Sequence, residues 1–498
     1  MFIDRQTEMV TLENEYSRDE ASFVVVYGRR RVGKTTLLTE FIRDKKAVYY
    51  LATEESESQN LLAFKEVVAQ TFNDNFLLNA NISRWEDVFA RLIEVAGTTG
   101  AGEPAITTAV ADAKESQDLA GTPTATKPQS PKTVIIIDEF QYLCKANKAF
   151  ASILQRTWDT TLSQQNVMLG LCGSLINMMV EQALSYSSPL YGRWTAQIHM
   201  KQIPFCYYSQ FFPKATNRQL VERYSVTGGV PKYIELFKSS RSVYSEIEQN
   251  ILSTDSFLYD EPNFLLQKEV SEIGSYFSII KAIAAGNERP AKIASLLEVK
   301  QTSLTRYLSV LIDLDIVGRE VPVTETNPGK SKKGLYRIKD NYLRFWFRYV
   351  YLYKSFLESG HASYVLQNIQ QNFVSGHVAY VYEGICRDAV WDLAAKGTFP
   401  FAPEKVGRFW QTRGASDEEI DVVALSTSQN AIAFGECKYW KSLVGCNVLR
   451  ELEEKTKKVE WGKPERKEYY VLFSISGFTK ELKELADTRD DILLVEGV

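Results

Sequence analysis

The segment at residues 28–35, GRRRVGKT, constrains the fold of this chain more than any other feature. It matches the pattern G-x-x-x-x-G-K-[ST], and it follows the apolar run at 23–27 and precedes the helical pattern at 36–41. In such a strand–loop–helix unit, the glycines let backbone N–H groups converge on phosphates at the positive end of the helix. A chance match in coil would lack these flanks. The sequence therefore predicts a phosphate-binding loop in an α/β sheet.

The loop and the start of its helix supply the expected nucleotide contacts. Lys34 would reach the β- and γ-phosphates, and the hydroxyl of Thr35 would bind Mg²⁺. The full predicted set of nucleotide-binding residues is Gly28, Arg31, Val32, Gly33, Lys34, Thr35 and Thr36.

A pair of carboxylates follows the apolar strand pattern at 134–137. Asp138 would bind Mg²⁺ through water, and Glu139 would orient or activate the attacking water. The alternative is a solvated Asp-Glu pair at a strand end. With the loop upstream, the pair predicts ATP hydrolysis.

Three weaker features accompany this site. Ser174, after the strand pattern at 167–171, could sense the γ-phosphate or belong to a Gly-Ser turn. Arg193 is a candidate for stabilising transition-state charge, although surface arginines are common. The turn Gly228-Gly229-Val230-Pro231 would start a helix, either near nucleotide or as a connector.

Apolar runs separated by helical stretches predict a parallel sheet covered on both faces. The strands are expected at 23–27, 47–51, 134–137 and 167–171, with a weaker one at 197–203. Gly97 to Lys132 holds four prolines and no aromatic residue, which predicts a disordered insertion. A length of 498 residues suggests about three domains. We expect an ATPase core at 1–205, a helical lid at 206–269, a winged helix at 270–345 and a further α/β domain at 346–498. The lid would contain helices at 217–226 and 231–252.

The winged-helix prediction rests on helical patterns at 272–284, 291–297 and 303–314, followed by strands at 317–323 and 335–338. Leu304, Leu308 and Leu311 have core spacing, whereas Thr305 and Arg306 would face a DNA groove. Residues 288–348 contain twelve Lys and Arg against seven Asp and Glu, a net charge of +5. Three lysines are expected on the wing tip, Lys330, Lys332 and Lys333. DNA binding is one interpretation, and a protein-interaction or lid module is the other.

A second group of carboxylates lies in a strand–turn–strand pattern at 420–438. Asp421 on the first strand would approach Glu436 and Lys438, which share one face of the second strand. Asp421 and Glu436 would bind Mg²⁺, and Lys438 would position water and stabilise the pentavalent phosphate. Glu383, in the helical stretch 382–391, could add a third carboxylate. The alternative is that such a Glu-x-Lys triplet lines a solvated strand.

Two resemblances bring these motifs together. Arg5, Glu8, the loop, the Asp138-Glu139 pair and the turn at 228–231 resemble the archaeal-type ATPases, an AAA-like, STAND-related branch of P-loop proteins, over about residues 1–270. The match departs at Asp4, where that family usually has Gly. The resemblance implies ATP as the nucleotide.

The tail resembles the PD-(D/E)xK nuclease superfamily, with Ile420 in place of the leading Pro. The tract at 336–340 and the aromatic residues at 345–347 look like the linker in ATPase–nuclease fusions of the archaeal-type family.

These expectations combine into an ATP-regulated, Mg²⁺-dependent DNA endonuclease, with a role in defence by analogy alone. The alternative is a non-cleaving ATP switch that binds DNA or signals through an inactive tail. We expect nucleic acid as the partner, with DNA favoured over RNA, and allow for a homo-oligomer.

Composition sets the remaining bounds. The 58 Lys and Arg against 62 Asp and Glu leave a net charge of −4, and no apolar run approaches the roughly 18 residues that span a bilayer. Six scattered cysteines and three histidines suggest neither a zinc site nor a disulfide framework. The first residues carry no basic and apolar leader, so a cytoplasmic protein without membrane contact is expected.

Overall fold

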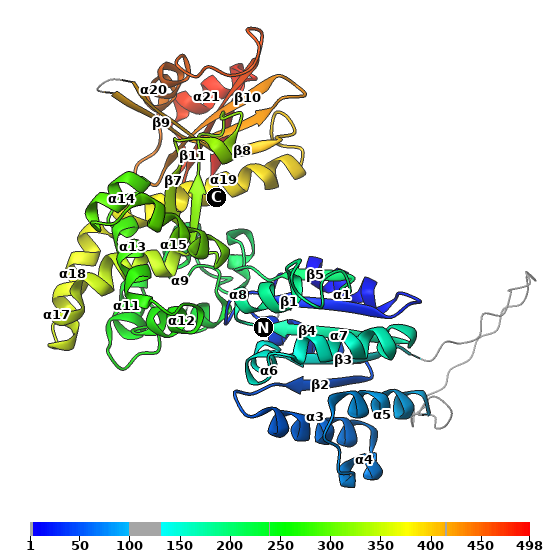
Figure 1. The fold of residues 1–498 in the computed structure, drawn as a ribbon. Helices are drawn as coiled ribbons and strands as arrows, with labels where there is room; N and C mark the ends of the chain where they lie inside the picture. Colours follow the sequence, from blue (N-terminus) through cyan, green and yellow to red (C-terminus); the bar gives the residue numbers. More distant parts are fainter. Residues whose placement is uncertain (1–2, 99–130, 239, 414–415) are drawn as a thin grey trace, which may run out of the picture. The chain divides into compact units, whose positions relative to one another are not determined.

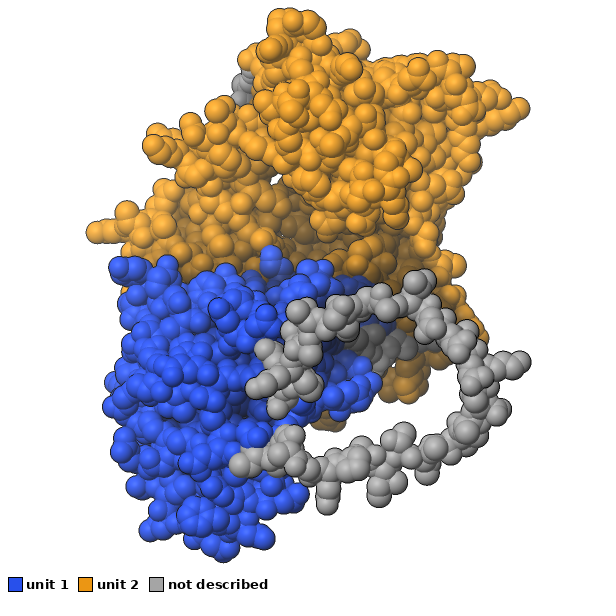
Figure 2. Space-filling model, turned by 90° about the vertical axis from the view of Figure 1, so that its right-hand side faces the viewer, with its two compact units in different colours: residues 1–201 blue, residues 202–498 orange. Residues whose placement is uncertain are grey.

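In a computed structural model, residues 3–98, 131–238, 240–413 and 416–498 are described. The chain divides into two compact units, Met1–Lys201 and Gln202–Val498 (Figure 2). Most of the predicted insertion, residues 99–130, lies outside the described residues. None of the helices in the described ranges is long and apolar enough to cross a membrane.

Unit 1 is built on a five-stranded parallel sheet (Figure 1). Its strands lie in the order β2-β3-β4-β1-β5, and every neighbouring pair is parallel. The α/β fold and the parallel sheet expected from the sequence are therefore confirmed. The strands are β1 (Ser22–Tyr27), β2 (Ala47–Leu51), β3 (Thr133–Asp138), β4 (Val167–Gly173) and β5 (Ala196–His199).

The central strands are apolar on both sides because helices cover both faces of the sheet. Phe23 and Val25 of β1 belong to the larger core, whereas Val24 and Val26 belong to a second core on the opposite face. The larger core includes side chains from α3 (Glu57–Phe72), α5 (Trp85–Thr98) and α7 (Phe150–Thr160). The smaller core includes α1 (Gln6–Tyr16) and α2 (Lys34–Ile42). The remaining helices of unit 1 are α4 (Asn75–Asn79), α6 (Gln141–Ala146) and α8 (Ile176–Met179).

The structure corrects three predicted boundaries in unit 1. Gly97 lies in helix α5, so this residue belongs to a helix and not to the predicted insertion. Lys132 is buried, and its ammonium group donates to the carbonyl oxygens of Glu15 (3.3 Å) and Glu20 (2.7 Å). These carbonyl groups near the end of α1 need donors, which explains why this Lys belongs to the core. Strand β5 ends at His199 and does not continue to residue 203.

The first part of unit 2 is helical. Its helices are α9 (Asn217–Thr227), α10 (Pro231–Ile234), α11 (Val243–Ile247) and α12 (Glu261–Glu269). The single helix expected at 231–252 is wrong, because α10 stops at Ile234. Ser242 then caps α11 by accepting a hydrogen bond from the backbone N–H of Ser245 (3.2 Å). A Ser-rich stretch favours such a cap over a continuing helix.

Three helices and a two-stranded antiparallel sheet follow, in the order expected from the sequence. They are α13 (Ile273–Ala284), α14 (Pro290–Leu296), α15 (Gln301–Asp313), β6 (Val317–Glu320) and β7 (Leu335–Ile338). Leu304, Leu308 and Leu311 are buried, whereas Thr305 and Arg306 are exposed. Strand β6 is shorter than expected, since the backbone of Val323 pairs with Arg408 of a later strand.

The last part of unit 2 holds a mixed sheet in the order β12-β11-β10-β9-β8 (Figure 1). Strands β8, β9 and β10 are antiparallel to one another in turn, and β10, β11 and β12 are parallel. The predicted strand–turn–strand is present as β9 and β10. The strands are β8 (Lys405–Arg413), β9 (Ser416–Ser426), β10 (Ala431–Lys438), β11 (Lys467–Ser474) and β12 (Ile492–Glu496).

Helices cover both faces of this sheet. Helices α20 (Cys446–Thr456) and α21 (Lys480–Thr488) pack on one face and share an apolar core with Ile432 and Phe434 of β10. Helix α19 (Ala379–Ala395) contacts β8, β9 and β10 and lies on the other face. Helices α16 (Asn341–Phe345), α17 (Lys354–Glu358) and α18 (Ala362–Phe373) precede it.

Two backbone segments, at Ile203 and at Gly229, approach each other closely at the start of unit 2. The backbone N–H of Ile203 donates to the carbonyl oxygen of Gly229 (2.8 Å), and a Cβ at position 229 would lie 1.9 Å from the carbonyl oxygen of Ile203. Only glycine fits this contact without a backbone shift.

We expect Gly229→Ala to lower the free energy of unfolding of unit 2 by about 1–3 kcal/mol, because overpacking forces the backbone apart. Gly274→Ala is the control, since a Cβ there meets no atom within 4 Å and should change stability by less than about 0.5 kcal/mol. Denaturant titration followed by tryptophan fluorescence measures both. Equal stability of the two variants would contradict the steric argument.

Candidate functional site

The predicted phosphate-binding loop connects β1 to α2 and holds a backbone that suits anions. Gly28, Arg31 and Gly33 have positive φ angles of 151°, 72° and 99°. A Cβ at Gly28 would lie 2.3 Å from the carbonyl oxygen of Met200, so a larger residue does not fit there. Helix α2 has no side-chain cap, which leaves the N–H groups of its first turn, including Thr36, available for phosphate oxygens.

Lys34 and Thr35 take the expected positions at the start of α2. The buried ammonium group of Lys34 donates to the carbonyl oxygens of Gly28 (2.7 Å) and Arg29 (2.9 Å). Burial lowers the pKa of Lys34, and the nearby carboxylates Asp138 and Glu139 oppose this shift. The hydroxyl of Thr35 donates to Asp138 Oδ2 at 3.1 Å, so the two residues predicted to hold Mg²⁺ are in contact.

The strand order explains why these residues meet. Strand β4 lies between β3 and β1, and the carboxyl ends of parallel strands meet at one edge of the sheet. Glu139 follows β3 with a positive φ of 55°, and its carboxylate accepts from Ser174 Oγ at 2.7 Å and from Gln141. The serine considered as a γ-phosphate sensor therefore contacts the residue expected to activate water.

Sequence reasoning missed two polar residues at this edge. The hydroxyl of Tyr49, on strand β2, donates to Asp138 Oδ2, and burial raises the pKa of this tyrosine. Gln141, at the start of α6, is fully buried beside Glu139. The position of Tyr49 could be found only by knowing that β2 pairs with β3, because 89 residues separate it from Asp138.

Arg5, directly before α1, contacts the backbone of the phosphate-binding loop. Arg5 is buried and donates to the carbonyl oxygens of Val32 (2.9 Å) and Lys201 (2.8 Å), and it pairs with Glu8 (3.1 Å). Asp4 has a φ of 56°, a conformation that favours glycine and that Asp tolerates better than most residues. This explains how Asp can stand where the family pattern has Gly.

None of the contacts described for Arg193 joins it to the residues of the phosphate-binding loop. Its guanidinium group pairs with Asp159 at 2.8–3.2 Å and donates to the carbonyl oxygens of Pro189 and Tyr191. These bonds account for the ordered position of the side chain. A catalytic role for Arg193 stays a prediction.

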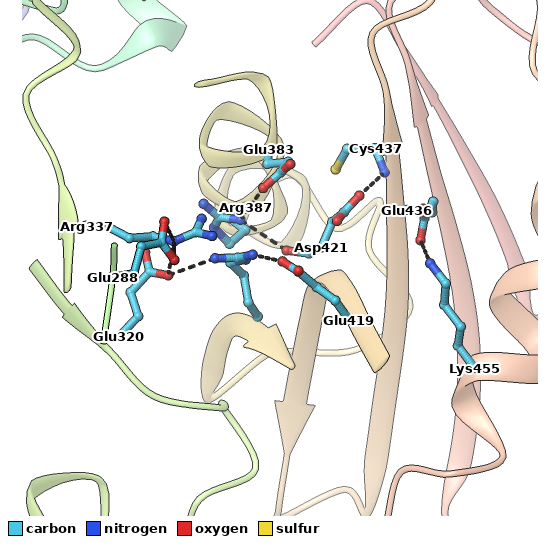
Figure 3. A network of polar contacts seen from close by, with 11 residues as sticks. Glu288, Glu320, Arg337, Glu383, Arg387, Glu419, Asp421, Glu436, Cys437 and Lys455 are labelled. Atoms are coloured by element: carbon cyan, nitrogen blue, oxygen red, sulfur yellow. Dashed lines mark hydrogen bonds and ion pairs between the residues drawn. The ribbon is translucent and has the colours of Figure 1, made fainter. Parts of the chain in front are cut away.

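Asp421 and Glu436, of the second group of predicted residues, lie where β9 and β10 stop pairing (Figure 3). The strands pair from Ala431–Ser426 to Gly435–Val422, and the next positions along them are Glu436 and Asp421. The carboxylate of Asp421 accepts a hydrogen bond from the backbone N–H of Cys437 at 3.0 Å. This side-chain bond takes the place of the next backbone hydrogen bond between β9 and β10. Burial raises the pKa of Asp421, and the nearby charge of Glu436 raises it further.

A β-bulge sets the direction of Asp421. Pairing between β8 and β9 passes from Gly407–Val423 to Phe409–Ile420. Arg408 on β8 therefore lies opposite the two residues of β9 between these pairs, Asp421 and Val422. Ile420 and Val423 both face the core under α20, which regular alternation would forbid. Bulges re-aim side chains in this way, and no sequence pattern indicated this one.

Glu436 and Lys438 share one face of β10 as expected. The ammonium group of Lys438 donates to Glu436 Oε1 at 2.7 Å, and Lys455 of α20 donates to Oε2 at 3.0 Å. Glu436 is buried, with 7% exposure, so two cations balance its charge. Lys455 was missed because it comes from a separate helix packed on the sheet.

Glu383 approaches Asp421 from helix α19, on the side of the sheet opposite to α20 (Figure 3). Burial raises the pKa of Glu383, and Asp421 raises it further. Arg387 lies 3.9 Å from Glu383 and donates to the backbone carbonyl of Asp421 at 3.1 Å. Within the described ranges, no three His, Cys, Asp or Glu side chains are arranged to hold a metal ion. Asp421 and Glu436 lie at neighbouring positions of β9 and β10, and metal binding by them, with Glu383 as a third ligand, stays a prediction.

A chain of ion pairs reaches this centre from the β6–β7 sheet (Figure 3). Arg337 pairs with Glu288 (3.0 Å) and lies 3.8 Å from Glu320. Arg408 is buried between Glu320 (3.4 Å) and Glu419. A buried arginine without such partners would be costly, so these contacts hold β6, β7, β8 and β9 together.

Comparisons with known proteins agree with the nucleotide site. A family model described as an ATPase domain predominantly from Archaea matches residues 2–237. An uncharacterized protein of Methanocaldococcus jannaschii is 34% identical over 490 residues, which cover 98% of both chains. The chain belongs to this archaeal-type ATPase family. A second model, for archaeal and bacterial proteins of unknown function, matches residues 346–458 of the ATPase.

Other proteins resemble the archaeal-type ATPase in part. An uncharacterized ATP-binding protein of M. jannaschii is 44% identical over 46 residues, 9% of this chain and 78% of that protein. The Walker-type ATPase of Pyrococcus abyssi is 18% identical, with a TM-score of 0.47 over 70% of this chain and 96% of that one. The ORC2 protein of Aeropyrum pernix is 11% identical, with a TM-score of 0.39 over 74% and 95%.

We expect Glu139→Gln to retain ATP binding and to lower hydrolysis by about 10²–10⁴-fold, because it removes the base but keeps the shape of the side chain. Lys34→Ala should abolish nucleotide binding. Glu40→Gln is the control, since Glu40 lies near the far end of α2 from the loop and pairs with Arg43, the residue after this helix. Phosphate release and fluorescent-nucleotide binding measure the two effects. Unchanged hydrolysis in Glu139→Gln would remove this residue from the mechanism.

Proposed function

We propose that this ATPase uses ATP and Mg²⁺ at its loop to control metal-dependent cleavage of nucleic acid by its C-terminal sheet. The observation that supports the proposal is that Asp421 and Glu436 occupy the positions next to the last pair of β9 and β10, where Lys438 donates to Glu436 at 2.7 Å. Two carboxylates beside a lysine suit phosphodiester hydrolysis. A role in defence against foreign DNA stays a prediction by analogy.

The donor set fits a hard divalent cation. Mg²⁺ is commonly bound by one or two carboxylates, with waters and phosphate oxygens completing the octahedron, and Asp421 and Glu436 supply such a pair. The chemistry supplied when Mg²⁺ is bound is Lewis-acid polarisation of the phosphodiester and acidification of water. Lys438 would place its charge on the pentavalent phosphate, and Lys455 would balance Glu436 from the other side.

Contacts between the first helices of unit 2 and the carboxylate centre support control by ATP. Tyr439, directly after Lys438, donates its hydroxyl to the carbonyl oxygen of Arg218 at 3.1 Å. The guanidinium group of Arg218, on α9, donates to Ser476 Oγ (2.8 Å) and to the carbonyl oxygen of Trp440. Helix α9 ends at the glycine turn that closes on Ile203, where the chain enters unit 2. A shift of this turn would therefore move α9 and the residues that it contacts directly after Lys438.

The segment from α13 to β7 is proposed as the winged helix that contacts DNA. The exposed Thr305 and Arg306 on α15 and the exposed lysines of the β6–β7 loop support this assignment. Phosphate contacts from such lysines position a protein on nucleic acid without reading its sequence. The domain boundaries at 205, 269 and 345 and a homo-oligomeric state belong to the same proposal.

One observation favours the non-cleaving alternative. Both oxygens of Glu436 are engaged by ammonium groups, and a metal would have to compete with Lys438 and Lys455 for them. If these pairs persist with nucleic acid bound, the tail would bind without cutting. Direct measurement of cleavage distinguishes the two functions.

We expect Glu436→Ala to lower plasmid cleavage by about 10²-fold or more, because a metal contributes several kcal/mol to transition-state stabilisation. Glu454→Ala is the matched control, an exposed carboxylate on α20 that pairs with Lys457. Cleavage is measured with Mg²⁺, with and without ATP, and after EDTA, which should abolish it. Intact plasmid with the unmodified protein under all conditions would overturn the nuclease proposal.

A further inference from the structure

Two adjoining cavities in unit 2 share Arg289, Trp410 and Gln411 in their linings and are taken together as one groove. The first has a volume of about 510 Å³ and the second about 310 Å³. The groove is lined by the starts of α14 and α15, by the loop between β6 and β7, and by strand β8. We call it the basic groove, for the charge described next.

The described residues that line the first cavity include three cations and no carboxylate. Arg289, Lys332 and Lys333 contribute positive charge, and Lys333 pairs with Glu325 at 2.5 Å. Arg289 and Lys332 are exposed, so their charged groups can reach a bound polyanion. Such an excess of positive charge within a cavity attracts phosphates and makes binding depend on salt.

The second cavity contains three carboxylates, each of which has a cationic partner. Glu288 pairs with Arg337 at 3.0 Å. Glu419 pairs with Arg408, and Glu418 pairs with Lys458. These pairs prevent the carboxylates from opposing an anion, and exposed Lys292 adds further positive charge to the lining.

The basic groove leads toward the carboxylate centre. Arg408 lies opposite the bulge that contains Asp421, and Glu419 precedes Asp421 by two positions on β9. A strand rises about 3.3 Å per residue, so Glu419 and Asp421 are separated along β9 by about twice this rise. One nucleotide can span that distance. Trp410 and Gln411 line both cavities; Trp410 is mostly buried, and the amide of Gln411 donates to the carbonyl oxygen of Lys458 at 3.3 Å.

We propose that the basic groove binds a single-stranded segment of nucleic acid and directs it to Asp421. Cavities of this size accommodate roughly one or two nucleotides each, which fits a single strand rather than a duplex. A positively charged groove that follows the phosphate backbone is the usual site for a single strand. The delivery of the strand for cleavage rests on the proposed nuclease function, whereas binding does not.

The test measures binding of a short fluorescein-labelled oligothymidylate to the full chain by anisotropy at several salt concentrations. Arg289→Ala/Lys332→Ala removes two charges from the groove. Lys480→Ala/Lys483→Ala removes two charges from exposed positions on α21 that line neither cavity and lie outside the proposed winged helix. The Glu436→Ala substitution is present in all proteins to prevent cleavage, and unfolding midpoints check that each variant folds.

The groove variant should bind roughly tenfold more weakly, and the slope of log K against log salt should fall by about 1.4, since each phosphate contact contributes about 0.7. The control pair should stay within about twofold of the parent. Equal losses in both pairs, or no loss in the groove variant, would overturn the proposal. Equal affinity for a duplex of the same length would overturn the single-strand assignment, and full competition by polyglutamate would overturn nucleic acid as the ligand.

Failure of the nuclease proposal gives a different result. If the unmodified protein leaves oligothymidylate intact with Mg²⁺ while the groove variant still loses affinity, the basic groove stands as a binding site and cleavage fails.

Discussion

A charged side chain that leaves water needs opposite charges or hydrogen bonds around it, and both centres of this chain are arranged by that requirement. Asp138 meets it with the hydroxyls of Thr35 and Tyr49. Glu436 meets it with two ammonium groups, Lys438 and Lys455. In each case the partners come from different elements, so the packing of the elements and the geometry of the centre are set together.

The two centres differ in how the backbone delivers their carboxylates. Asp138 ends a fully buried parallel strand, and its position follows from the strand order alone. Asp421 lies inside a long antiparallel strand, and a bulge opposite Arg408 is needed to turn it out of the regular alternation. The same arginine pairs with Glu320 and Glu419, so the irregular backbone is held by buried charge rather than by ladder hydrogen bonds alone.

Local patterns made much of this arrangement predictable. The loop at 28–35, the pair Asp138-Glu139 and the strand–turn–strand around Glu436 depend on neighbours in sequence, and the structure places them as expected. Tyr49 and Lys455 depend on which strand or helix lies alongside, which one sequence does not reveal. Likewise, a one-residue bulge cannot be recognised from a pattern of alternating apolar residues. The point at which a helical pattern is interrupted also depends on caps such as Ser242.

The strand order of unit 1 has a consequence for synthesis on the ribosome. Strand β1 emerges first, yet its partners in the sheet are β4 and β5, which are the last two strands of the unit to be made. Its apolar faces therefore stay without sheet partners until about residue 199 has left the tunnel. Because exposed apolar strands promote aggregation of nascent chains, the chain should depend on chaperones most during this interval.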